Sequence, residues 1–235
     1  MSNSDLFLDL YKQLEDELEN KYRNSRRKYS SVIIEFLRDE ESASMRDELD
    51  VCREIRNILT HNANLEGVPI IEPSGPIVRA LESILEYVRR PPLAVDYATK
   101  GDQVMKANLN QRVLRLMEVM EKNGFSHVPV MKEGRFCGVF SQGSIFMYVL
   151  KGGRNITKET TLQDMATHLK IEEHPENYIF LPMSVSYTVA RNKFIKPAGR
   201  GKRISVIFIT QTGHQDERLL GMLTPWDVLR DLNCT

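Results

Sequence analysis

Two short groups of residues have side chains and spacings that could bind a ligand or catalyse a reaction. The first is Gly221, Thr224 and Asp227, spaced by three, with Gly221 inside the apolar run 219–223 and the other two after it. If a helix begins after Thr224, its free backbone N–H groups and dipole favour an anion, and the Asp227 carboxylate can accept hydrogen bonds from a diol. The order Thr224, Pro225, Asp227 also suits a helix N-cap that binds nothing. The group is therefore either a ligand site or a helix cap.

The second group is the pattern Arg-Asn-x-x-x-His formed by Arg56, Asn57 and His61. An imidazole can take or give a proton near neutral pH, and a guanidinium can hold a phosphate and its developing charge. At about 100° per residue, Arg56 and His61 lie roughly 140° apart on an ideal helix. They converge only if His61 falls beyond the helix end or if two copies pair. The alternative is a chance pattern in an arginine-rich chain.

Basic residues crowd the segment before the apolar run 204–209. They could neutralise further phosphates, as ATP or a linear dinucleotide would require, or they could form a solvated loop. Trp226, in contrast, is expected to be packed. The basic residues are Lys193, Lys196, Arg200, Lys202 and Arg203.

Histidine and cysteine spacing does not predict a metal site. Four of the histidines show no ligand spacing and are interpreted as structural or exposed. The three cysteines are far apart and outside any C-x-x-C pattern, so reduced thiols are expected. These residues are His127, His168, His174 and His214, with Cys52, Cys137 and Cys234.

The composition limits the class of protein. With 235 residues and 41% hydrophobic content, the chain can form two small domains. Lys plus Arg and Asp plus Glu both number 32, so a zero net charge argues against a wholly electrostatic nucleic-acid binder. There is no signal-peptide pattern and no apolar run of membrane-spanning length. We expect a cytoplasmic protein with no membrane contact.

The first ninety or so residues have helical periodicity. Apolar residues recur at three- and four-residue spacing over 7–22, after a possible N-cap at Ser4. A short apolar segment follows at 32–37, a second long helix is predicted from about residue 42 to near Asn62, and a third over 77–88. Pro91 and Pro92 end the helical region. The pattern predicts an all-α domain over residues 1–90.

Residues 93–232 contain a repeat, and its helices alternate with β-branched strands. The first copy is predicted as helix 110–123, strands 125–131 and 136–141, and another helix. The second copy is predicted as helix 188–194, strands 204–209 and 219–224, and helix 225–232. Both copies have the order helix, strand, strand, helix.

That order, with the strings GFSHVPVM, GRFCGVFSQGSIF, RISVIFI and RLLGMLTPWDVL, resembles the cystathionine β-synthase (CBS) domain family, whose members occur as tandem pairs. The resemblance implies one module over 93–150 and a second over 156–235. The expected fold class is α+β, with an N-terminal all-α helical domain followed by a tandem CBS pair of α/β repeats with short sheets.

The CBS resemblance implies an adenine-nucleotide site in the second copy, with Gly221 completing its pattern. In the family, the Thr hydroxyl and the following helix N-terminus hold phosphate, and the Asp carboxylate takes the ribose hydroxyls; these roles fall on Thr224 and Asp227. Family members contact the base through strands that bracket the cleft. Those positions carry over to Ile179, Phe180, Arg203, Ser205 and Val206.

The first copy has Gly138, Ser141 and Ser144 at the corresponding positions. Ser144 departs from the family pattern because it lacks the charge and the bidentate reach that would hold a ribose diol. We therefore expect one occupied site per pair.

The helical half resembles the HEPN family, because Arg56, Asn57 and His61 stand at the end of the second long helix of an all-α domain. Many HEPN members are metal-independent ribonucleases that act as dimers. The resemblance implies that these three residues are catalytic, that RNA is the substrate and that the protein is a homodimer. The alternative is a catalytically silent helical dimerisation domain.

These expectations combine into a homodimeric sensor. The tandem CBS pair binds a nucleotide of the AMP, ADP, ATP or S-adenosylmethionine class, without a required metal, and the helical domain carries the output. The alternative function is a non-enzymatic nucleotide-binding scaffold or a regulatory subunit of a separate enzyme.

Overall fold

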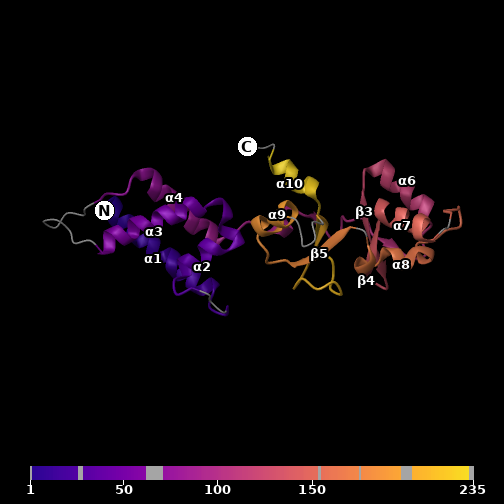
Figure 1. Ribbon diagram of the computed structural model, residues 1–235, viewed down its shortest axis with the longest axis horizontal. Coiled ribbons are helices and arrows are strands. Elements are labelled where there is room, and N and C mark those ends of the chain that lie inside the picture. The colour runs from indigo at the N-terminus through magenta and orange to yellow at the C-terminus, as the bar shows by residue number, and fades with distance from the viewer. Residues whose placement is uncertain are drawn as a thin grey trace. The chain divides into compact units, whose positions relative to one another are not determined.

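A computed structural model describes residues 2–25, 29–61, 71–152, 155–174, 176–196 and 203–232 (Figure 1). Contacts divide the chain into two compact units, Met1–Pro92 and Leu93–Thr235. Asn62, Arg200, Lys202 and Cys234, which the sequence singled out, lie outside the described residues.

The first unit is all-helical. It contains α1 (Asn3–Lys21), α2 (Val32–Arg38), the 3₁₀ helix η1 (Glu40–Ser44), α3 (Arg46–His61) and α4 (Gly75–Arg89). The helices enclose one apolar core, because each carries its apolar residues on one stripe. Its fully buried members include Phe7, Leu14, Leu18, Ile33, Phe36, Leu49, Cys52 and Leu81.

The first helix begins earlier than predicted. Ser2, and not Ser4, is the N-cap of α1: its hydroxyl accepts from the Asp5 N–H at 3.1 Å, and the Asp5 carboxylate accepts from the Ser2 N–H at 3.2 Å. Ser4 is buried in the first turn and donates to the Glu72 carboxylate at 2.6 Å. The apolar segment 32–37 forms α2, and η1 delays the start of α3 beyond the predicted residue 42.

The second unit holds two modules of strand, helix, strand, strand and helix. Module 1 consists of β2 (Ala107–Asn108), α6 (Val113–Asn123), β3 (His127–Lys132), β4 (Arg135–Ser141) and α7 (Gln142–Gly152). Module 2 consists of β5 (Asn177–Pro182), α9 (Tyr187–Ile195), β6 (Ile204–Thr210), β7 (Gly221–Leu223) and α10 (Pro225–Leu232). Each copy thus has the predicted helix, strand, strand, helix order, with a further strand in front.

Short elements precede each module. Helix α5 (Ala94–Tyr97) and strand β1 (Thr99–Lys100) precede module 1, and η2 (Leu162–Met165), α8 (Ala166–Leu169) and η3 (Ile171–Glu173) precede module 2. Helices α7 and α8 contact β4, as Figure 1 shows. The predicted α+β fold class is confirmed.

The two sheets differ in how they are completed. One has the order β2-β3-β4, and the other has the order β1-β7-β6-β5. Strand β1 precedes module 1 in the chain but pairs antiparallel with the last strand of module 2, with Thr99 opposite Met222. The start of the unit is therefore hydrogen-bonded to its end, which brings the two modules together.

An apolar cluster joins the sheets. Phe136 of β4 packs edge-on against Phe180 of β5 at a ring-centroid distance of 5.1 Å, and contacts Phe208 of β6 at the same distance. Val139 and Val206 are fully buried in this cluster. No helix within the described ranges is long and apolar enough to cross a bilayer.

Candidate nucleotide pocket

Thr224 and Asp227 lie together at the start of α10. Strand β7 ends at Leu223, and Pro225 opens the helix at the position where a backbone N–H is not needed. The Asp227 Oδ2 accepts hydrogen bonds from the Thr224 backbone N–H at 2.7 Å and from the Thr224 hydroxyl at 2.8 Å. This is a helix cap, and the described residues donate no hydrogen bond to Asp227 Oδ1. That oxygen is available to a diol.

A cavity of about 280 Å³ lies next to this helix start. Three segments of the chain form its wall: the stretch that begins with β1, the turn between α6 and β3, and the junction of β7 with α10. Module 2 therefore supplies the Thr224 and Asp227 pair, and module 1 supplies the facing turn. The described lining residues are Thr99, Gln103, Val104, Met105, Asn123, Gly124, Phe125, Ser126, His127, Met222, Thr224, Trp226 and Asp227.

The turn between α6 and β3 depends on Gly124. This residue ends α6 with φ of 69°, in the left-handed region that side chains disfavour. The next backbone N–H, that of Phe125, donates to the Met120 carbonyl at 2.9 Å. The reversal carries Ser126, and His127 at the start of β3, to the cavity wall.

Trp226 does not follow the prediction that it is packed. Its side chain is 68% exposed and lines the cavity. The buried stripe of α10 passes through Val228, and a residue two positions away on a helix lies on a different face. The helix therefore presents the indole to the cavity mouth.

Gly221 acts through packing. A Cβ at this position would lie 2.9 Å from the Ala98 Cβ, which is closer than real side chains approach. The glycine lets β1 pair tightly with β7. Its counterpart Gly138 is similarly confined, since a Cβ there would collide with the Leu169 carbonyl. The glycine of the repeated pattern thus positions a neighbouring segment in both copies.

The strand residues predicted to contact the base are not among the residues that line this cavity. Ile179 and Phe180 pack in apolar clusters, and Val206 is fully buried. Arg203 is exposed and Ser205 half-buried, at the start of β6. The cavity is instead lined by the α6–β3 turn of module 1. Residue spacing does not predict that this turn faces Thr224 and Asp227, because the two segments are far apart in the sequence.

The first copy forms a cap without an acid of its own. The Ser144 hydroxyl accepts from the Ser141 N–H at 3.0 Å, and the Ser141 hydroxyl accepts from the Gly143 N–H at 3.1 Å. Ser141 and Ser144 are both fully buried. The helix start of α7 therefore has the geometry of α10, with a hydroxyl in the place of the Asp227 carboxylate.

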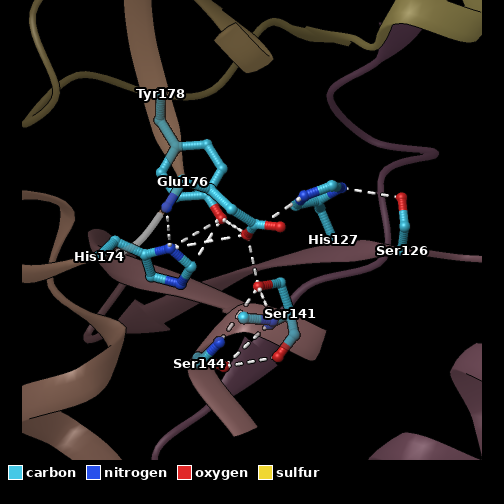
Figure 2. Close-up of polar contacts among 8 residues, drawn as sticks. Ser126, His127, Ser141, Ser144, His174, Glu176 and Tyr178 are labelled. Carbon is cyan, nitrogen blue, oxygen red and sulfur yellow. Dashed lines mark hydrogen bonds and ion pairs between the residues drawn. The ribbon is translucent and has the colours of Figure 1, made fainter. Parts of the chain in front are cut away.

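Glu176 of module 2 provides a carboxylate at the helix start of α7, where module 1 has no acid of its own (Figure 2). Its Oε2 accepts from the Ser141 hydroxyl at 2.6 Å and from the Tyr178 hydroxyl at 2.5 Å, and lies 3.4 Å from His127 Nε2. Burial raises the pKa of Glu176, but the contacts with His127, Ser141 and Tyr178 outweigh burial and lower the pKa to about 2. A ligand would have to displace this carboxylate to reach Ser141.

His174 lies on the other side of the same carboxylate. Its Nδ1 accepts from the Glu176 backbone N–H at 3.3 Å, and its side chain is fully buried. Burial lowers the pKa of His174, so the ring is held neutral. No group of three or more metal-ligating side chains is arranged around an ion site within the described ranges.

The Arg-Asn-x-x-x-His pattern lies on α3. Arg56 is directed to α1: its guanidinium carbon lies 5.7 Å from the Tyr11 ring centroid, and its Nη2 lies 3.7 Å from the Glu15 carboxylate. His61 is exposed and is the last residue of α3. Because the helix extends to His61, the two side chains point about 140° apart within one chain.

Residues 86–151 match the family described as CBS domain, a range that contains module 1 except for the last residue of α7. The match supports the predicted tandem CBS pair, since module 2 repeats the element order of module 1. The uncharacterized protein MJ1225 of Methanocaldococcus jannaschii is 24% identical over 124 residues, which are 49% of this chain and 43% of that protein. The chain thus spans less than half the length of this relative.

Solved structures give similar matches. The CBS domain pair of protein MJ0100, in complex with 5′-methylthioadenosine and S-adenosyl-L-methionine, is 17% identical. The match covers 61% of this chain and 98% of that chain, with a TM-score of 0.43. The protein CbpB in complex with c-di-AMP is 19% identical over 65% of this chain and 91% of that chain, with a TM-score of 0.44.

Proposed function

We propose that this protein is a regulatory protein that binds an adenine nucleotide in the cavity next to Thr224 and Asp227. The observation that carries the proposal is this cavity of about 280 Å³, in which the helix start of α10 faces the α6–β3 turn. Pockets of roughly this size and mixed polarity are typical small-molecule sites. The CBS match of module 1 supports the adenine-nucleotide class.

The cavity offers a partner for each part of a nucleotide. The free Oδ1 of Asp227 suits the ribose diol, because a carboxylate oxygen accepts from both hydroxyls. The N-terminus of α10 favours a phosphate through its dipole. The exposed ring of Trp226 offers a face on which adenine can stack.

Calorimetry on ligand-free protein tests this proposal. Titration with AMP, ADP, ATP and S-adenosylmethionine is expected to give binding by at least one of them, at a site that Asp227→Asn weakens. Mass spectrometry of small molecules released from the purified protein would identify a co-purifying ligand. If none of the four ligands binds to protein shown to be free of ligand, the proposal is wrong.

A second candidate function is RNA cleavage by a HEPN-like helical unit. In its favour, Arg56 and His61 both reach the surface in the last turns of α3, with about a third of the Arg56 side chain exposed. Since the two side chains diverge on one helix, the reaction needs a homodimer in which one chain supplies His61 and the other Arg56. Asn57, half-buried between them, would position the RNA.

Incubation of RNA with the full chain, with a chelator present, separates this enzyme from a nucleotide-binding scaffold. Loss of cleavage in both Arg56→Ala and His61→Ala supports the enzyme, provided that Arg53→Ala keeps wild-type activity. Arg53 is the matched control because it lies on the same helix and pairs with Asp50 and Glu54. If wild type does not cleave RNA with or without AMP, the helical unit acts as a scaffold.

A further inference from the structure

A chain of three polar side chains begins at the cavity wall and ends at the half-buried acid Glu176. Ser126 Oγ lies 2.8 Å from His127 Nδ1, and His127 Nε2 lies 3.4 Å from the Glu176 carboxylate (Figure 2). Ser126 and His127 line the cavity, whereas the Nε2 atom is buried and directed to Glu176. The order Ser126, His127, Glu176 therefore connects the cavity to the interior of the unit.

The Glu176 carboxylate determines which ring nitrogen of neutral His127 carries the hydrogen. A neutral imidazole carries one N–H, and a carboxylate 3.4 Å from Nε2 favours the tautomer with the proton on that atom. Nδ1 is then an acceptor and receives the hydrogen of the Ser126 hydroxyl. In this state the Ser126 oxygen offers only lone pairs to the cavity.

A second proton on His127 reverses this arrangement. Nδ1 becomes a donor to Ser126 Oγ, and the Ser126 hydrogen has to turn away from the ring. Ser126 is exposed at the cavity wall, so its hydroxyl can donate to a ligand in the cavity. The same proton adds a positive charge near the site.

We propose that the chain Ser126–His127–Glu176 sets the hydrogen-bonding character of the nucleotide pocket, so that protonation of His127 turns Ser126 into a donor and strengthens binding of an anionic nucleotide. The inference rests on the proposed nucleotide site and names its regulation. Phosphate oxygens and adenine ring nitrogens are acceptors, so both can receive a hydrogen bond from a donor at this position. A cationic ligand such as S-adenosylmethionine should bind more weakly, because the added positive charge repels it.

Several titratable groups lie around His127 or line the same cavity. Glu176 approaches from the start of β5 and is charged, since its pKa is about 2. His174 shares that carboxylate but is held neutral by burial, and the Tyr178 ring packs edge-on against His127 at 5.9 Å. Asp227 is the acid of α10 that lines the same cavity.

The test measures AMP affinity at about pH 8 and about pH 5.5, which bracket the ordinary range of an imidazole. The second proton of the AMP phosphate also titrates near 6, so wild type is compared with His127→Gln, in which the ligand titrates as before but residue 127 does not. Between these pH values, the affinity of wild type is expected to rise about tenfold more than that of the variant. His214→Gln is the matched control, since His214 is exposed and outside the cavity, and it should behave as wild type.

Ser126→Ala tests the hydroxyl on its own. The side chain is exposed, so folding should be unaffected, and circular dichroism checks this for each variant. The variant keeps the His127 charge but loses the donor, so its affinity should depend less on pH than that of wild type. S-adenosylmethionine should show the opposite pH dependence to AMP in wild type.

The outcomes distinguish the inference from the proposed function. Binding of AMP with the same pH dependence in wild type and a folded His127→Gln overturns the inference and leaves the nucleotide site in place. Full wild-type pH dependence in Ser126→Ala shows that the hydroxyl takes no part, which contradicts the switch. Absence of AMP binding at both pH values overturns the proposed site and the inference with it.

Discussion

Ser141 and Glu176 are joined by a 2.6 Å hydrogen bond, in which the serine hydroxyl of module 1 donates to a carboxylate of module 2. In module 2 the equivalent threonine, Thr224, bonds to Asp227 three residues further along its own chain segment. One copy of the repeated pattern therefore faces a cavity with its own acid, and the other is closed by an acid from the opposite module. The two copies therefore differ in whether the helix start faces a cavity.

The closed first copy predicts one nucleotide per chain. Ser141→Ala should leave the stoichiometry of AMP binding unchanged, because Ser141 is not among the residues that line the cavity. It should lower the free energy of unfolding by about 2 kcal/mol, since a buried hydrogen bond to a charged group is lost. Calorimetry and urea denaturation measure the two effects. A second binding event in wild type would contradict the closed site.

Glu176 predicts a specific loss of stability in acid. Its pKa is lowered in the folded protein to about 2, from an ordinary value of 4.5, so its ionised form stabilises the fold above about pH 4.5. This contribution should decline as the pH falls from 4.5 toward 2. Glu176→Gln should remove that decline, because the amide does not titrate.

Urea denaturation at several pH values measures this difference between wild type and Glu176→Gln. His174, whose pKa is also lowered by burial, adds a loss of stability that begins nearer 6.5 in wild type. The comparison is therefore made below pH 4.5. Parallel curves for the two proteins in that range would show that the Glu176 contacts do not stabilise the fold.

Asp227→Asn separates ligand binding from helix capping. The amide oxygen can still cap Thr224, so the free energy of unfolding should fall by only about 1 kcal/mol, while AMP affinity should fall at least about tenfold because the charge is lost. Calorimetry and thermal unfolding measure both. Asp164→Asn is a matched control, because Asp164 accepts from the Thr161 N–H and hydroxyl at 2.8 and 2.9 Å, outside the cavity. Equal loss of affinity in both variants would show that the effect is structural.

Trp226 provides a direct signal of binding. It is the single tryptophan of the chain and lines the cavity, so AMP should change its fluorescence when adenine stacks on the ring. Trp226→Leu should weaken AMP binding about tenfold with little change in stability, because the ring is 68% exposed. Phe146→Leu, at an equally exposed aromatic residue of α7 outside the cavity, should bind as wild type does. Unchanged fluorescence at saturating AMP would place the base elsewhere.

Gly221→Ala should destabilise the second unit by about 2 kcal/mol, since the added Cβ would lie 2.9 Å from the Ala98 Cβ. Ala98→Gly removes the opposing atom. The double variant should therefore recover part of the loss, which denaturant unfolding measures as a coupling energy. Additive losses would show that the two positions do not compete for space.

Local patterns in the sequence were sufficient for the long helices and for the helix, strand, strand, helix order of each module, but not for short elements such as β1 and β2. The three- and four-residue spacing that ends in Leu18 predicts α1, and the β-branched run 204–209 predicts β6, because these periods place apolar residues on one face. The pattern Thr224, Pro225, Asp227 likewise predicts the start of α10, since a cap depends on neighbours three residues apart. The choice of Ser2 over Ser4 as the first N-cap depended on which side chain Glu72 binds, a contact from another part of the chain.

The site itself was decided by the packing of one module against the other. Thr224 and Asp227 follow from the sequence, but the turn at Ser126 and His127 reaches them only because β1 pairs with β7 and draws the modules together. The closure of the first copy by Glu176, 35 residues after Ser141, has the same origin. Contacts of this kind depend on sheet pairing between distant segments, for which residue spacing carries no signal.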